Sequence, residues 1–243
     1  MITMTLKVDK YQLVTPGELL AEGRQFRAGM GVYREEDQFY SAVTGLASIS
    51  GPNVVGVVPL QGSYLPMEGD VIIGKITYVG VTSWRVDIRG PYLAVLSVNN
   101  ATDRVFDPMR DEISRLLTTG DTIMALVVAY DRSRDPMLTM MGRGLRKLVK
   151  GRLIEIDAVK VPRVIGKKGS MISMLKKETG SQIFVGQNGR ILIASPNADM
   201  ENLVTLALNK IVREAHTAGL TDRVKNFLVD EKNQLAEESD NSE

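Results

Sequence analysis

The chain has no cysteine and a single histidine, His216, among its 243 residues. Without thiols it can build neither a disulfide framework nor a thiolate metal site. The single histidine has no second histidine with which to coordinate zinc. The sequence therefore argues against a zinc site and against a serine or cysteine nucleophile activated by histidine. We interpret His216 as a residue at the surface or end of a helix.

Long hydrophobic runs are also missing. No apolar stretch approaches the ~20 residues of a membrane-spanning helix, and the opening MITMTLKVDK has no apolar signal-peptide core. We therefore expect a cytoplasmic protein that makes no membrane contact. A hydrophobic content of 44% still supports real cores, and the length suits two or three small domains.

The net charge of +1 hides an uneven distribution. Between Leu145 and Gly180 there are ten basic and three acidic residues, whereas from Gly219 to Glu243 there are three basic and seven acidic residues. A basic block on a nearly neutral chain predicts polyanion binding at one place. A solvated helix face is the plainer alternative.

At the centre of the basic block lies the tetrapeptide Gly166-Lys167-Lys168-Gly169. Two glycines allow a tight turn and close approach of a ligand to the backbone. The helix expected to follow would point its N–H groups and positive dipole end at that ligand. A sugar-phosphate chain suits this arrangement, although a helix–turn–helix joint with surface lysines could contain the same four residues.

The flanking patterns favour the first interpretation. We expect strands over Leu153–Lys160, Gln182–Gly186 and Arg190–Ala194, a turn at Asn188-Gly189, and a long helix from Met200 to Ala215. Strand, helix, GxxG, helix, strand, strand, helix is the order of a KH domain of the eukaryotic type, whose GxxG loop clamps a nucleotide backbone. We predict such a βααββα domain over residues 145–220.

Residues 66–142 predict a five-stranded OB barrel. The expected strands are Val71–Val79, Ser83–Ile88, Tyr92–Val98, Thr122–Tyr130 and Met137–Met140, with a helical piece within Asp107–Leu117. Five strands with a helical connection between the third and fourth are the plan of an OB fold. Gly69-Asp70 and Gly120-Asp121 each come directly before an expected strand that would pack in such a barrel. A generic β-barrel linker domain is the alternative.

Alternation along the second of these strands separates core from ligand-facing residues. Trp84 falls on the core face, although a base-stacking role is its alternative, and Arg85 falls on the other face. The RNA-binding candidates are Arg85, Arg89, Arg132 and Arg134 in the OB barrel, and Arg163, Gly166, Lys167, Lys168, Gly169, Lys176 and Lys177 in the KH domain. We expect no catalytic residue, no metal ligand and no cofactor.

The two ends of the chain differ in character. Residues 1–65 contain short β-like stretches broken by glycine and predict a β domain, so the whole chain is multidomain, mainly β, with an α/β part near its end. The acidic cluster from Glu35 to Asp37 is a solvated loop or, alternatively, a divalent-cation site. Residues 221–243 form an acidic tail, which we expect to be partly disordered because no apolar periodicity continues beyond Asp230.

Taken in order, these segments resemble the RNA-binding cap subunit of the exosome over about residues 5–225. The similar stretches are VTPGELL, PMEGDVIIGKI, WRVDI and VIGKKGSMI, with an OB domain of the ribosomal-protein S-one type. The resemblance implies the archaeal form, with three caps on a hexameric ring of phosphorolytic ribonuclease subunits. The caps would capture RNA and guide its 3′ end inward without cutting it, and the first domain would dock on the ring. Arg85 replaces the aromatic residue common in OB domains, which favours backbone contacts over base stacking.

Two other functions stay open. A free-standing ribosome- or translation-associated RNA-binding protein could use the same OB and KH modules, but it would not need residues 1–65. An RNA-processing enzyme has less support, because the sequence contains no HExxH and no paired histidines, although its scattered acidic residues leave a two-metal site open. We expect a non-enzyme whose partners are single-stranded RNA and the ribonuclease ring.

Overall fold

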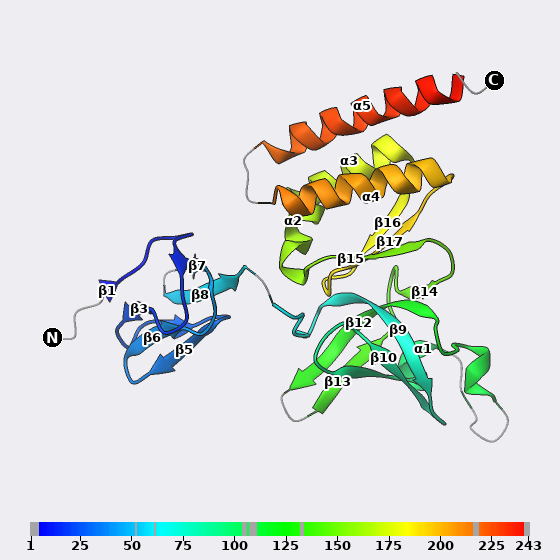
Figure 1. The fold of residues 1–243 in the computed structure, drawn as a ribbon. Helices are drawn as coiled ribbons and strands as arrows, with labels where there is room; N and C mark the ends of the chain where they lie inside the picture. Colours follow the sequence, from blue (N-terminus) through cyan, green and yellow to red (C-terminus); the bar gives the residue numbers. More distant parts are fainter. Residues whose placement is uncertain are drawn as a thin grey trace. The chain divides into compact units, whose positions relative to one another are not determined.

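The structure is a computed structural model that describes residues 5–51, 53–60, 62–103, 106, 111–131, 134–215 and 219–240, the last seven of these by backbone only. The chain forms two compact units, Met1–Gly62 and Ser63–Glu243 (Figure 1). Within the described ranges, no helix combines the length and the apolar character that crossing a bilayer requires.

The first unit is a β domain, as predicted. Its strands are β1 (Thr5–Leu6), β2 (Leu13–Val14), β3 (Leu19–Glu22), β4 (Arg27–Ala28), β5 (Val32–Glu35), β6 (Gln38–Ser41), β7 (Gly45–Ser50) and β8 (Val54–Pro59). They form two four-stranded sheets, in the orders β1-β3-β6-β5 and β2-β7-β8-β4. Both sheets contribute to one core, which contains Leu20, Phe39 and Val55.

The acidic cluster lies at the turn between β5 and β6. The Asp37 carboxylate accepts from Arg24 at 3.1 Å and from Arg34 at 3.2 Å. Two arginines therefore neutralise the carboxylate that a cation would need, which favours the loop interpretation over a divalent-cation site.

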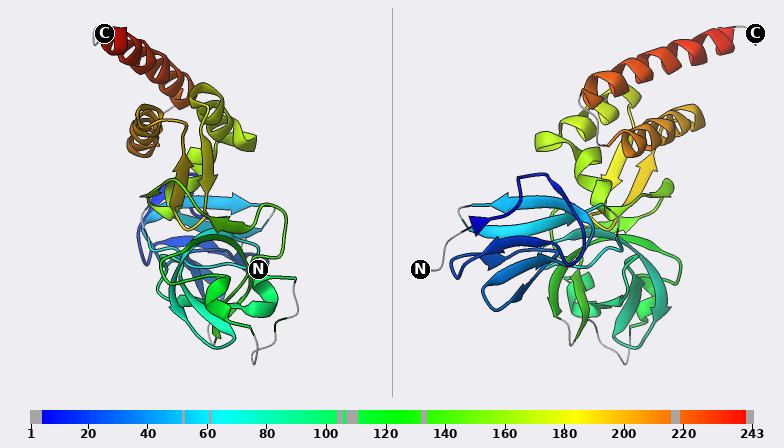
Figure 2. Two further views of the ribbon diagram at one scale, coloured as in Figure 1. Left: turned by 90° about the vertical axis from the view of Figure 1, so that its right-hand side faces the viewer. Right: turned by 60° about the vertical axis from the view of Figure 1, so that its left-hand side comes forward.

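The second unit begins with the predicted five-stranded barrel. It contains β9 (Val71–Val79), β10 (Ser83–Asp87), β11 (Leu93–Ser97), α1 (Val98–Ala101), η1 (Ile113–Arg115), β12 (Thr122–Asp131) and β13 (Arg134–Thr139). The barrel closes because β12 pairs with both β9 and β13, and β13 also pairs with β11, in parallel (Figure 2). The helical connection lies between the third and fourth strands, as expected, but its predicted stretch from 107 to 110 lies outside the described residues.

Trp84 is fully buried in the barrel core, and its indole Nε1 donates to the Leu117 carbonyl oxygen at 2.9 Å. A buried indole needs such a partner, so the interpretation of Trp84 as a core residue is confirmed. Tyr64 also packs in this core and donates to Asp70 Oδ2 at 2.7 Å. Burial and this hydrogen bond raise the pKa of Tyr64 far above its ordinary value. Although predicted within the first domain, Tyr64 thus belongs to the barrel.

The KH domain follows in the predicted βααββα order. Its elements are β15 (Arg152–Glu155), η2 (Ala158–Lys160), α2 (Val161–Ile165), η3 (Lys167–Gly169), α3 (Ser170–Thr179), β16 (Gln182–Val185), β17 (Arg190–Ala194) and α4 (Ala198–Arg213). The sheet order is β15-β17-β16. The first strand stops at Glu155 rather than at Lys160, because the chain turns into η2. Residues 146–148, expected within the KH domain, instead form β14 (Arg146–Leu148) and pair with β12 of the barrel.

The helix α5 (Leu220–Asp240) corrects the expectation of disorder beyond Asp230. Leu220, Val224 and Leu228 recur every four residues and are buried in the KH core, so the first half of α5 is held by packing. The second half has no glycine or proline and is rich in good helix formers. These propensities let the helix continue past its buried residues, although the sequence there has no apolar periodicity.

The hairpin turn between β16 and β17 clamps the KH domain to the barrel. The Asn188 side chain is fully buried, and its Nδ2 donates to the carbonyl oxygens of Ile73 and Ile88, each at 2.8 Å. The next residue, Gly189, has φ +82, and a Cβ there would lie 2.2 Å from the Ile156 carbonyl oxygen. The predicted turn is confirmed, and its residues also join the two domains.

Ion pairs surround this clamp. The buried Arg190 side chain donates to Asp87 Oδ2 at 2.5 Å and to Glu155 Oε1 at 2.9 Å. Burial disfavours ionisation of Asp87, but the hydrogen bonds from Arg190 and from the Arg89 backbone outweigh it, so the pKa of Asp87 is lowered. Barrel and KH sheet share a small apolar cluster of Ile73, Leu148 and Leu192. The KH sheet thus lies between its own helices and the barrel (Figure 1).

Candidate nucleic-acid interface

The GxxG loop joins α2 to α3 through two glycines with different backbone conformations. Gly166 has φ 75 and ψ 172, a region that only glycine occupies readily. Gly169 has φ 78 and ψ 14, in the left-handed helical region. No side chain caps the start of α3, so its first N–H groups are available to an anion. The loop therefore has the backbone geometry that phosphate recognition needs.

Replacing each of the two glycines by alanine is expected to lower the free energy of unfolding by a different amount. A Cβ on Gly166 would lie 2.7 Å from the Met171 backbone nitrogen, whereas a Cβ on Gly169 meets nothing closer than 3.9 Å. We expect Gly166→Ala to destabilise the second unit by about 3 kcal/mol, and Gly169→Ala by about 1 kcal/mol. Urea unfolding followed by circular dichroism measures both. Equal losses would contradict the loop geometry.

The basic residues predicted for the KH domain divide into two groups. Arg163, Lys167 and Lys168 lie within one short stretch at the loop and are exposed. None of the three forms an ion pair with the acidic side chains that the structure describes. Lys176 and Lys177 lie in the last turn of α3, about 10 Å along the helix from its start. There they face the negative end of the helix dipole, so the structure does not bring them to the loop.

On the barrel, Arg85 lies on the outer face of β10, as predicted. Its guanidinium forms an ion pair with Asp135 of β13, and both side chains are about half exposed. In the ladder Arg85 is opposite Tyr78 of β9 on one side and Val95 of β11 on the other. Tyr78 is 63% exposed. A cation and an aromatic ring therefore stand side by side on the barrel surface.

Tyr78 is a candidate that the sequence analysis missed. Strict alternation from Ile72 and Ile76 would turn Tyr78 toward the core. A bulge in the β9–β10 ladder, between Arg85 and Val86, shifts the register so that Tyr78 points outward. The bulge has no clear signal in the sequence. OB domains commonly carry an aromatic residue at the position of Arg85 on β10. In this chain the neighbouring Tyr78 on β9 provides an exposed aromatic side chain instead.

The remaining barrel candidates are placed elsewhere. Arg89 turns toward the KH domain, donating to the Ile156 carbonyl oxygen and pairing with Glu155 at 3.4 Å, so it stabilises the joint rather than facing a ligand. Arg134 begins β13 and pairs with Asp131 at 3.8 Å. Arg132 lies outside the described residues. The end of β12 and the start of β13, which Asp131 and Arg134 mark, lie at the end of the barrel away from the KH helices (Figures 1 and 2).

Among the residues that the structure describes, no group of three or more acidic or histidine side chains is arranged to hold a metal ion. The two recognisable surfaces are thus the GxxG loop and the outer face of β9–β10, both of which combine basic side chains with features suited to a nucleic-acid strand.

Comparisons with known proteins agree with this arrangement. Family models match residues 11–61 (exosome RNA binding protein RRP4 N-terminal domain), 63–128 (RRP4, S1 domain) and 152–206 (KH domain). The exosome complex component Rrp4 of Thermofilum pendens is 45% identical over 93% of this chain and 95% of its own length. The protein of the same name from Pyrococcus furiosus is 44% identical over 95% and 87%, respectively. A solved crystal structure described as an exosome complex RNA-binding protein matches 71% of this chain and 98% of its own, with a TM-score of 0.66 and 46% identity.

Proposed function

Because the chain belongs to the Rrp4 family of exosome components, we propose that it is a non-catalytic, RNA-binding cap of a cytoplasmic, archaeal-type exosome. It captures single-stranded RNA and guides the 3′ end into a ring of phosphorolytic exoribonuclease subunits, for 3′-to-5′ degradation and processing. Three caps sit on each hexameric ring. The observation that carries the proposal is the GxxG loop with its two exposed lysines, in a chain whose relatives are named as exosome components.

RNA contact is divided between two surfaces. The GxxG loop holds the sugar-phosphate backbone through Lys167, Lys168 and the start of α3. On the barrel, Arg85 exchanges its half-exposed pairing with Asp135 for a phosphate, while Tyr78 offers a face on which any base can stack. Because most of these groups are cations, binding is salt-dependent and only weakly selective for sequence. Gly166 and Gly169 position the backbone, and Arg163 adds charge at the same loop.

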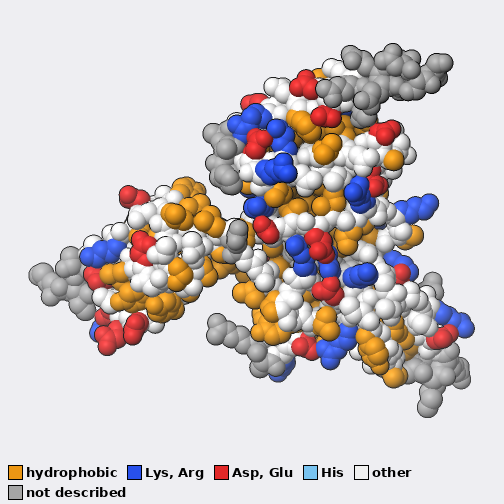
Figure 3. Space-filling model, viewed as in Figure 1, with side chains coloured by type: hydrophobic (Ala, Val, Ile, Leu, Met, Phe, Trp, Pro, Cys, Tyr) orange, Lys and Arg blue, Asp and Glu red, His pale blue; other side chains and the backbone are white. Residues whose placement is uncertain are grey.

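The first unit is the part best suited to docking on the ring. Residues 1–65 carry five basic and six acidic side chains, which makes a poor surface for a polyanion. Large hydrophobic side chains are exposed instead, including Tyr11, Leu13, Met30 and Tyr33, and hydrophobic atoms cover much of the face of this unit seen in Figure 3. Exposed apolar patches of this kind mark protein interfaces. A free translation factor would not need them.

The RNA-binding part of the proposal predicts a large loss from Lys167→Asp combined with Lys168→Asp. Acidic side chains repel the phosphates that the lysines attract, and aspartate tolerates the left-handed backbone of residue 168, at φ 53. We expect affinity for a ~20-nucleotide single strand to fall by about 1–3 kcal/mol, or about 5- to 150-fold. The salt slope should fall by about 2. Fluorescence anisotropy over a salt series measures both.

A matched variant keeps the charge change and moves it off the loop. Lys10→Asp combined with Lys225→Asp alters net charge equally at exposed positions, so it should bind RNA nearly as the wild type does. Equal affinity of the loop variant and the wild type, with both folded, would mean that the loop does not hold RNA.

A further inference from the structure

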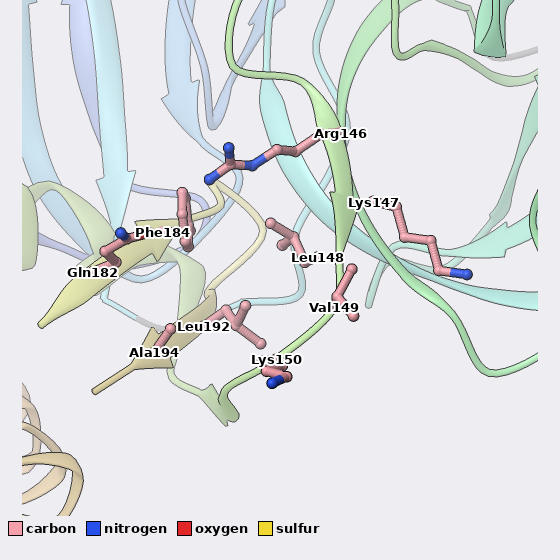
Figure 4. A pocket seen from close by; sticks show the side chains of 9 residues that line it. All are labelled: Arg146, Lys147, Leu148, Val149, Lys150, Gln182, Phe184, Leu192 and Ala194. Atoms are coloured by element: carbon pink, nitrogen blue, oxygen red, sulfur yellow. The ribbon is translucent and has the colours of Figure 1, made fainter. Parts of the chain in front are cut away.

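A groove of about 430 Å³ opens between β14 and the face of the KH sheet that carries no helices (Figure 4). Its floor is apolar and consists of Leu148, Phe184 and Leu192; its rim consists of Arg146, Lys150 and Gln182. The volume is in the range of small-ligand sites. No residue of the GxxG loop lines it.

The groove exists because β16 is the edge strand of the KH sheet. Ile183 points into the core beneath the helices, so its neighbours Gln182 and Phe184 point to the opposite face. The barrel covers that face around Leu192 but leaves the Phe184 ring partly exposed. A partly exposed aromatic ring on an apolar floor is therefore available to a flat ligand.

The rim of the groove is positively charged. Arg146 lies over the Phe184 ring, with its guanidinium carbon 5.1 Å from the ring centroid. Lys147 is engaged elsewhere: it points away from the groove (Figure 4) and its Nζ lies 2.6 Å from Asp121. Arg146 and Lys150 pair with no acidic side chain in the described part of the chain, and no acidic residue lines the groove.

We propose that this groove binds one nucleotide of single-stranded RNA, as a second KH-domain subsite on the opposite face of the sheet from the GxxG loop. Arg146, which is exposed, swings off the Phe184 ring to admit the base, and the base then lies against Phe184 and Leu192 with the Arg146 guanidinium over its other face. Lys150 contacts a phosphate. The proposal rests on the proposed RNA-binding function, and it adds that RNA held at the loop also passes the β16 edge.

Stacking favours a nucleotide over an acidic peptide as the occupant. The carboxylates of an acidic peptide would pair with Arg146 and Lys150 but would make no stacking contact with the Phe184 ring, over which Arg146 lies. A nucleobase uses both, because aromatic rings and guanidinium groups stack on bases of any identity. The apolar floor and the charged rim therefore match the two halves of a nucleotide.

Photocrosslinking to a ~20-nucleotide RNA containing 4-thiouridine tests the proposal in the full-length protein. We expect adducts on the peptide that contains Phe184, as well as on the GxxG peptide. Phe184→Leu, which keeps an apolar side chain, should remove the first adduct and weaken binding about 5-fold or more. Lys150→Glu, at an exposed position that leaves the packing intact, should weaken binding similarly. The Lys10→Asp and Lys225→Asp control should do neither.

The outcomes separate this proposal from the broader one. If both groove variants bind and crosslink as the wild type does, while the Lys167→Asp and Lys168→Asp variant loses RNA, the groove is not an RNA subsite and the cap proposal stands. If the wild-type protein binds no RNA, the RNA-binding function itself is wrong. If a glutamate-rich peptide binds the wild type and Lys150→Glu abolishes this, with no RNA adduct at Phe184, the groove is a protein-docking site and the proposal is overturned.

Discussion

Asn188→Ala is expected to destabilise the barrel–KH unit by about 2–6 kcal/mol. The wild-type amide donates to two buried carbonyls, those of Ile73 and Ile88. Alanine leaves both without partners, and each unsatisfied buried group costs about 1–3 kcal/mol. Because these carbonyls belong to the barrel and Asn188 belongs to the KH hairpin, the loss falls on the joint between the domains.

Two spectroscopic signals follow the urea unfolding of the two domains that meet at this joint. Fluorescence of Trp84, the sole tryptophan and a fully buried one, reports on the barrel, and far-ultraviolet circular dichroism reports mainly on the KH helices. Their transitions should coincide in the wild type and fall to lower urea in the variant. Asn226→Ala, at an exposed position of α5, should change stability by less than about 0.5 kcal/mol. A clamp variant as stable as this control would show that the hairpin does not join the domains.

Removing residues 1–62 should abolish assembly with the ribonuclease ring and leave RNA binding intact. The cut must precede Tyr64, because that ring packs in the barrel core and donates to Asp70. The remaining unit keeps both its own cores and the clamp between barrel and KH domain, so the fragment should fold. It also keeps every basic side chain assigned to RNA, so its salt slope should match that of the full chain.

Size-exclusion chromatography with purified ring subunits measures the assembly, and anisotropy measures RNA binding. A milder variant, Tyr11→Ser with Leu13→Ser, changes two exposed hydrophobic side chains of the first unit and should weaken co-elution without unfolding that unit. Co-elution of the truncated fragment with the ring would place docking in the barrel or the KH domain instead.

Much of the fold was predictable because local signals agreed with one another. The turn at Asn188-Gly189, the strands on either side and the long helix α4 each have their own pattern, and their order with GxxG identified the KH domain. Alternation placed Trp84 in the core. Such patterns depend on burial at a fixed period, which the sequence contains directly.

The candidate site was less predictable, because it depends on register and on domain contacts. A bulge turned Tyr78 outward, and the joint between domains turned Arg89 away from any ligand. The groove beside Phe184 requires β14 to pair with the barrel and β16 to form the sheet edge. No local pattern encodes these arrangements, since each involves residues far apart in the chain.

The most direct test of the cap proposal compares RNA degradation by the ring alone, the ring with this protein, and this protein alone. The substrate is a long single-stranded RNA labelled at its 5′ end, with and without inorganic phosphate. We expect phosphate-dependent shortening by the ring, faster shortening when this protein is added, and none by this protein alone with or without Mg²⁺. An unchanged ring rate would contradict the role as a cap. Shortening by this protein alone, proportional to its dose and abolished by one carboxylate substitution, would contradict the absence of catalysis.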